Sequence, residues 1–221
     1  MTLPKSTDES APLRPADEAV DQSGMTVCGC IHLRRRSSAL LLTLALICYA
    51  ITTKEAGNMT LPSVLPALKD LDDGEGKNLI ALLPGVGTGF YAVGKLSQIY
   101  STYHFGGRAV LIAASFGMGV SLLCFTTAIP AAMVIGWCSS RFAAAHFWGA
   151  ATRLIANWVQ PGESGKAMAS MGLACIGVAL FSLAFGCMLD VQPEGSLWRG
   201  PFFLVAGCLF SGCLLYAVRS L

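Results

Sequence analysis

The chain has 221 residues, of which 54% are hydrophobic and only 13% are charged. A soluble domain normally has about a quarter charged residues, so this composition favours a membrane protein. The formal net charge of +2 is small, and no basic patch is interleaved with aromatic residues, so a nucleic-acid partner is not expected.

The first 37 residues differ in composition from the rest of the chain. They are rich in Ser, Pro, Asp and Glu, which predicts a disordered tail over residues 1–37. Cys28 and Cys30 lie just before the first apolar run, where they are either palmitoylated or unmodified thiols. The other cysteines lie in apolar stretches without the spacing of a zinc site, so we expect neither a metal nor a cofactor.

Six apolar segments follow the tail, and most reach the length of about 20 residues that a bilayer requires. We expect helices because lipid cannot satisfy free backbone polar groups. The sequence therefore predicts an all-α, polytopic membrane protein with a six-helix domain over residues 38–219. The expected helices cover residues 38–65, 78–100, 109–127, 130–158, 166–189 and 201–218.

The basic residues gather in alternate connections between these segments. They occupy the tail, the second–third and fourth–fifth connections and the end of the chain, whereas the first–second connection is acidic. This asymmetry predicts that both termini are cytoplasmic. A plasma membrane and an organelle membrane are equally consistent with it.

The fourth segment contains three basic or titratable side chains. Arg141 lies about eleven residues into it, roughly 16 Å from its start. A central arginine costs at least about 2.5 kcal/mol to insert, so Arg141 should face a functional cavity or make a structural bond between helices. His146 is either a hydrogen-bonded packing residue or a proton-coupling group. Arg153 is close enough to the cytoplasmic end to reach the headgroups.

The first and second segments contain polar residues as well. Lys54 and Asn58 share a helix face, and Glu55 points about 100° away. These residues form a solute site, a coupling site or a pair that neutralises itself. Lys95 lies near the cytoplasmic end of the second segment, where it either lines a cavity or extends to the headgroups.

Three stretches resemble the major facilitator superfamily of transporters. "GKLSQIYSTYHFGGR" resembles its signature loop, of which Gly106 and Arg108 are retained. "RFAAAHFWGAATRLIANWVQPGESGKAM" resembles its fourth helix and the following loop, and "LWRGPFFLVAG" resembles the start of its sixth helix. The resemblance covers residues 38–219 and implies the N-terminal six-helix half of such a carrier.

Within that superfamily, the chain is most similar to the organophosphate–phosphate antiporter branch. The residues that match its motifs are Tyr91, Gly94, Lys95, Trp148, Arg153 and Trp158. The resemblance implies that Lys95 faces a central cavity and attracts an anion. The branch's arginine in the first helix falls on Asn58, and Ile99 and Tyr103 replace a glycine and an aspartate of the signature loop.

The expected function is secondary transport of a small solute, with an anion as one option, by alternating access. The alternative is a non-transporting scaffold or regulatory subunit that pairs with a full-length carrier. The expected partners are the lipid bilayer, a solute, and a second six-helix half or a second copy. No enzyme is expected, because the chain has no Walker loop, GxSxG elbow or HExxH motif. The substrate-binding candidates are Lys54, Glu55, Asn58, Tyr91, Lys95, Arg141, His146 and Arg153.

Overall fold

The computed structural model of the chain separates into two units, residues 1–38 and 39–221. It describes residues 25–27, 31–33, 37–69, 75–159, 161–190 and 197–218. The chain termini, Cys28, Cys30 and the acidic connection at 70–74 lie outside these described residues. Lipidation and the cytoplasmic placement of the termini therefore stay predictions.

The first unit contains two short strands, β1 (Met25–Val27) and β2 (Ile31–Leu33). They pair in antiparallel register, with Met25 opposite Leu33. Both strands lie within residues 1–37, for which the composition predicts disorder. The strands are rich in the apolar and β-branched residues that favour pairing, whereas the Ser, Pro and acidic residues of the tail lie mostly in residues 1–24, outside the described part.

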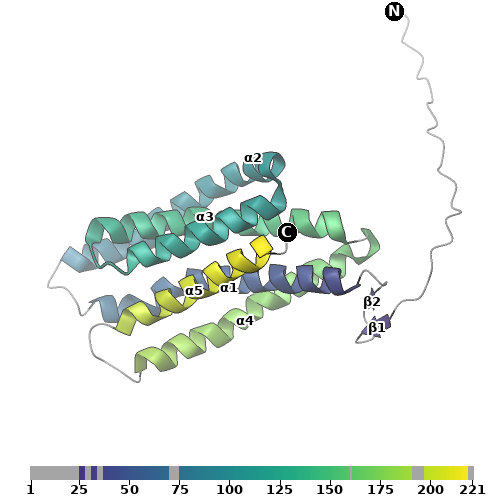
Figure 1. Cartoon of the computed structure of the whole chain (residues 1–221). Coiled ribbons are helices and arrows are strands. Elements are labelled where there is room, and N and C mark those ends of the chain that lie inside the picture. The colour runs from purple at the N-terminus through teal and green to yellow at the C-terminus, as the bar shows by residue number, and fades with distance from the viewer. Residues whose placement is uncertain are drawn as a thin grey trace, which may run out of the picture. The chain divides into compact units, whose positions relative to one another are not determined.

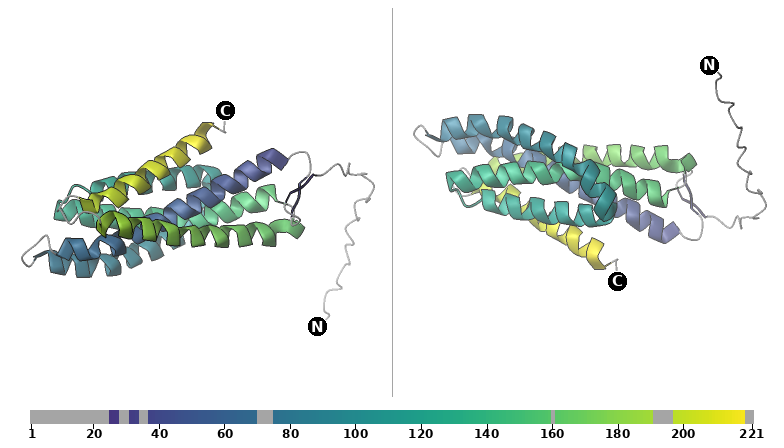
Figure 2. Two further views of the ribbon diagram at one scale, coloured as in Figure 1. Left: turned by 90° about the horizontal axis from the view of Figure 1, so that it is seen from below. Right: turned by 90° about the horizontal axis from the view of Figure 1, so that it is seen from above.

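The second unit is all-α. Its helices are α1 (Ser37–Lys69), α2 (Glu75–Phe125), α3 (Pro130–Trp158), α4 (Ser164–Asp190) and α5 (Gly200–Val218), with short 3₁₀ turns at Pro161–Glu163 and Leu197–Arg199. A break in α2 divides it into a first arm (75–105) and a second arm (107–125), so the unit contains six helical rods. Figures 1 and 2 show the rods running back and forth side by side.

The break in α2 lies at Gly106. Its φ of 77° and ψ of 155° belong to a region that is open essentially to glycine alone. The sequence predicts a helix end near residue 100 and a connection up to residue 108. In the structure the first arm instead continues to Phe105, and a single residue turns the chain back.

The two arms of α2 pack closely against their neighbours because glycines lie at the contacts. A Cβ on Gly94 would lie 2.7 Å from the carbonyl oxygen of Phe142 in α3. A Cβ on Gly136 of α3 would lie 2.6 Å from the carbonyl oxygen of Ser121 in the second arm. Small residues permit this approach of helix backbones, as they do in membrane bundles.

Side-chain hydrogen bonds connect α1 to the last two helices. The Tyr49 hydroxyl donates to the carbonyl oxygen of Cys208 in α5 at 3.0 Å. The Thr52 hydroxyl donates to the carbonyl oxygen of Ala174 in α4, also at 3.0 Å. These bonds fix the rotation of α1 in the bundle, and so decide which of its residues face α3.

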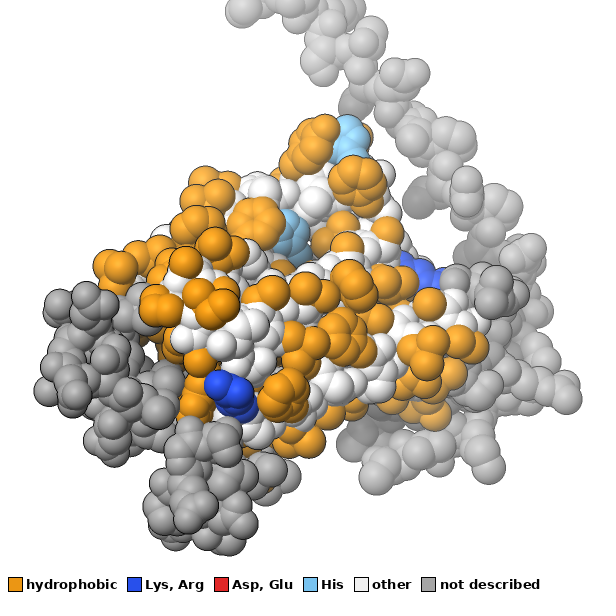
Figure 3. Space-filling model, turned by 60° about the vertical axis from the view of Figure 1, so that its left-hand side comes forward, with side chains coloured by type: hydrophobic (Ala, Val, Ile, Leu, Met, Phe, Trp, Pro, Cys, Tyr) orange, Lys and Arg blue, Asp and Glu red, His pale blue; other side chains and the backbone are white. Residues whose placement is uncertain are grey.

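The surface of the helical unit is unusually apolar. Large apolar side chains are exposed on several helices, among them Leu96 (76% exposed), Ile176 and Leu214. Figure 3 shows one face on which apolar side chains cover most of the described surface and no acidic side chain is visible. Extended apolar surfaces of this kind mark contacts with a membrane or with another protein.

Two stretches of the described residues are long and apolar enough to cross a membrane. They are Ala81–Phe125, which includes both arms of α2, and Gly200–Val218, with mean hydropathies of 1.8 and 2.0. A core helix of a soluble protein can have the same length and composition. These two stretches are therefore weak evidence of membrane association, and the six spans predicted from the sequence remain a proposal.

Candidate functional site: a polar cluster at mid-helix

Polar side chains from α1, the first arm of α2 and α3 meet close to the middle of each helix. Each lies within about eight residues of its helix midpoint, or ~12 Å along the axis. Helix length alone therefore places them far from both ends of the bundle. The members of this mid-helix cluster are Lys54, Glu55, Asn58, Tyr91, Lys95, Trp137 and Arg141.

A chain of polar contacts crosses from α1 to α3. Lys54 Nζ forms an ion pair with Glu55 Oε1. Asn58 Nδ2 donates to Glu55 Oε2 at 2.9 Å, and Arg141 Nη1 donates to Asn58 Oδ1. Lys54 is only 5% exposed, and a charge buried to this degree needs a paired partner. Although Lys54 and Glu55 leave the helix in different directions, their long side chains meet.

Two cations contact the ring of Tyr91. Lys95 Nζ lies 5.5 Å from the ring centroid, and the Arg141 guanidinium carbon lies 5.1 Å from it. The Arg141 guanidinium also lies 5.7 Å from the Trp137 ring. Aromatic rings attract cations through the negative potential of their faces, so these contacts hold both cations in place.

Neither of these two cations forms an ion pair with a carboxylate in the part of the chain that the structure describes. The Lys95 ammonium donates to the amide oxygen of Gln98 at 3.1 Å, and Arg141 donates to the amide of Asn58. The Glu55 carboxylate pairs with Lys54, and the two charges of that pair cancel. The cluster therefore has an excess of two positive charges, and an anion is the ligand that would compensate them.

A glycine of α2 makes room for the aromatic side of the cluster. A Cβ on Gly87 would lie 2.5 Å from Trp137 Nε1 and 3.2 Å from Arg141 Cγ. Trp137 itself is 4% exposed, and its indole N–H has no hydrogen-bond partner among the described residues. Trp137 is not among the residues that the sequence singles out, because a tryptophan in an apolar helix usually indicates packing.

His146 is not part of the cluster, although it lies on the same helix as Arg141. Its Nδ1 is 3.0 Å from the carbonyl oxygen of Phe142, and its Nε2 is 3.1 Å from the Ser97 hydroxyl. It lines an open groove of about 770 Å³ between α2 and α3, together with the rings of Phe90 and Phe105. Both ring nitrogens thus have polar partners in an otherwise apolar setting.

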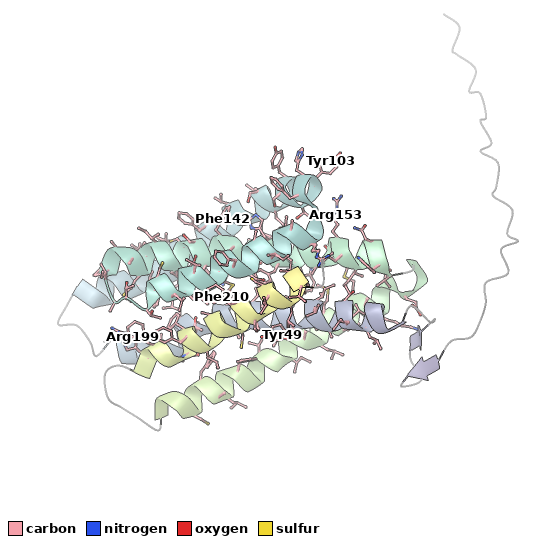
Figure 4. All side chains as sticks on the ribbon, in the orientation of Figure 1. Tyr49, Tyr103, Phe142, Arg153, Arg199 and Phe210 are labelled. Carbon is pink, nitrogen blue, oxygen red and sulfur yellow. The ribbon has the colours of Figure 1, made fainter. Side chains whose placement is uncertain are left out.

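The remaining candidates lie at the end of the bundle where the arms of α2 meet. Arg153 is exposed, and its guanidinium lies 5.9 Å from the ring of Tyr103; Figure 4 shows both residues at this end, with Arg199 at the opposite end. Arg108 donates to the carbonyl oxygen of Tyr216, one of the last four carbonyls of α5, which have no partner within the helix. Gly106 and Arg108 thus turn α2 and cap α5.

The described residues contain no group of three or more His, Cys, Asp or Glu side chains that could hold a metal ion. Comparison of the chain with protein-family models, with curated proteins and with solved structures finds no match. A proposal for the function therefore rests on the geometry of the chain.

Proposed function

We propose that this chain is a six-helix membrane unit that transports a small anionic solute by alternating access, in the manner of the major facilitator superfamily. The observation that carries the proposal is the pair of cations, Lys95 and Arg141, which both contact the Tyr91 ring and form no ion pair with a carboxylate among the described residues. They lie towards the middle of helices whose outer surface is apolar.

The apolar exterior supports insertion into lipid. Large exposed side chains on α2, α4 and α5 would otherwise face water, at a cost of roughly 25 cal/mol for each Å². In a membrane each of the six rods would span the bilayer. The end of the bundle that contains Arg108, Arg153 and Lys166 would be cytoplasmic. The chain order supports this, because α1, α3 and both arms of α2 alternate in direction.

The depth of the cluster supports transport. Ionisable residues inside a membrane are expensive and usually mark a substrate or ion pathway. Secondary carriers bind their solute near the bilayer midplane, between two repeats that rock about the site. The six rods would form one such repeat, and a second six-helix unit, from the same or another polypeptide, would close the other side.

The residues of the cluster would have different roles in transport. Lys95 and Arg141 would attract and hold the anion, and the ring of Tyr91 would help to hold both cations in place. Glu55 is the carboxylate of the cluster, and it would couple solute binding to a proton.

The test is uptake by purified protein in liposomes. Radiolabelled inorganic phosphate, acetate and succinate would be offered separately, with wild-type protein and the Arg141→Gln and Lys166→Gln variants. Lys166 is an exposed cation at the start of α4, so its removal is the matched control. We expect uptake of at least one anion by wild type and by Lys166→Gln, and none by Arg141→Gln. Specific binding of an anion without uptake would instead favour a non-transporting subunit.

A further inference from the structure

We infer that Asn58 acts as a neutral spacer that keeps the Arg141 guanidinium available to the solute by separating it from the carboxylate of Glu55. The inference rests on the proposed function, and it adds a residue that determines the specificity of the site for anions. The observation behind it is that the two functional atoms of one amide face opposite charges.

The hydrogen bonds fix the orientation of that amide. Asn58 Nδ2 donates to Glu55 Oε2, while Asn58 Oδ1 accepts from Arg141 Nη1. A flipped amide would place its NH₂ against a guanidinium that has only donors, and its oxygen against a carboxylate that has only acceptors. Asn58 is therefore held in one orientation by a group of α1 on one side and a group of α3 on the other.

This arrangement changes what an incoming anion must displace. A guanidinium that contacts a carboxylate directly forms an ion pair, frequently with two parallel hydrogen bonds, and this pair is stronger than a single bond to a neutral oxygen. Arg141 donates instead to an uncharged oxygen, and the Glu55 carboxylate pairs with Lys54. The anion therefore competes with one amide oxygen for Arg141 and does not have to break an ion pair.

The same geometry predicts what a carboxylate at this position would do. In the Asn58→Asp variant the new carboxylate occupies the place of the amide oxygen and pairs with Arg141. We expect at least tenfold weaker anion binding. Glutamine keeps an uncharged amide at this position, so the Asn58→Gln variant should lose less anion binding than Asn58→Asp.

A double variant separates the position of the carboxylate from the total charge. Glu55→Gln combined with Asn58→Asp moves one carboxylate by about one helical turn and leaves the net charge of the cluster unchanged. Because the carboxylate then contacts Arg141, binding should remain at least tenfold weaker than in wild type. Recovery of wild-type binding would show that only the net charge matters, and would overturn the role of Asn58.

The assay is equilibrium binding of radiolabelled inorganic phosphate and succinate to purified full-length protein in detergent, with the helical content of each variant checked by circular dichroism. If wild type binds neither anion, the proposed anion site fails. If wild type binds one of them and Asn58→Asp binds it equally well, the site stands and the spacer inference fails. A loss in Asn58→Gln as large as in Asn58→Asp, with helical content preserved, would also contradict the inference.

Discussion

The contact of the first arm of α2 with α3 at Gly94 gives a sharp test of the packing. In a Gly94→Ala variant the new Cβ would lie 2.7 Å from the carbonyl oxygen of Phe142 and 2.7 Å from the Cβ of Ala145. An ordinary contact begins at 3.4 Å, so the two helices would have to separate by about 0.7 Å. The Phe142 oxygen belongs to a helix backbone and cannot turn away as a flexible side chain would.

The expected cost follows from two opposing effects. Overpacking a tight contact destabilises a protein by about 1–3 kcal/mol, whereas replacing glycine by alanine within a helix stabilises it by up to about 1 kcal/mol. The net expectation for Gly94→Ala is a loss of about 1–2 kcal/mol. Gly94 lies next to Lys95, so anion binding should weaken as well.

The control is Gly89→Ala on the same arm. A Cβ at Gly89 meets nothing within 4 Å, so only the favourable helix effect remains. Thermal unfolding of both variants in detergent, followed by circular dichroism, should give a lower Tm for Gly94→Ala and an equal or higher Tm for Gly89→Ala. Equal stability of the two variants would refute the close approach of the helices.

Two further substitutions test the turn in α2 and the ion pair in α1. Gly106→Ala should lower the free energy of unfolding by about 1–3 kcal/mol, because alanine is strained at this φ and ψ; Gly165→Ala, in open space at the start of α4, should not. Glu55→Gln should cost about 3–5 kcal/mol by leaving Lys54 buried and unpaired, and Lys54→Met combined with Glu55→Gln should recover most of the loss. Chemical denaturation measures all four, and a double variant no more stable than Glu55→Gln would argue against the pair.

Much of the helical framework could be predicted because it follows from apolar composition over long stretches. The single-residue form of the turn in α2 could not be predicted. Pro62 lies inside α1 and does not end it, whereas the chain turns at Gly106 and not at the neighbouring Gly107. Either glycine of that pair permits a turn. The choice depends on which glycine packs against α3. Gly107 makes that contact, because a Cβ there would lie 2.6 Å from the Ala150 carbonyl oxygen, and the turn lies at Gly106.

In the candidate site, too, some features could be predicted from the sequence and others depend on tertiary packing. Polarity within apolar segments was enough to single out Lys54, Glu55, Asn58 and Arg141, because such residues are costly there. Their connection through the Asn58 amide depends on how α1 is rotated relative to α3, which tertiary contacts decide. His146 has the same sequence signal as Arg141, yet it lies five residues further along α3 and contacts Ser97 instead.

The turn at Gly106 has a mechanical consequence. A single residue joins the two arms of α2, so the joint has no spare length, and one arm cannot slide along its axis without pulling the other. The first arm contains Lys95, and the second begins beside Arg108, which holds the end of α5 through the Tyr216 carbonyl. Lys95 lies about 16 Å along the first arm from this turn, so a displacement of the arm at Lys95 would reach the end of α5 through Gly106 and Arg108.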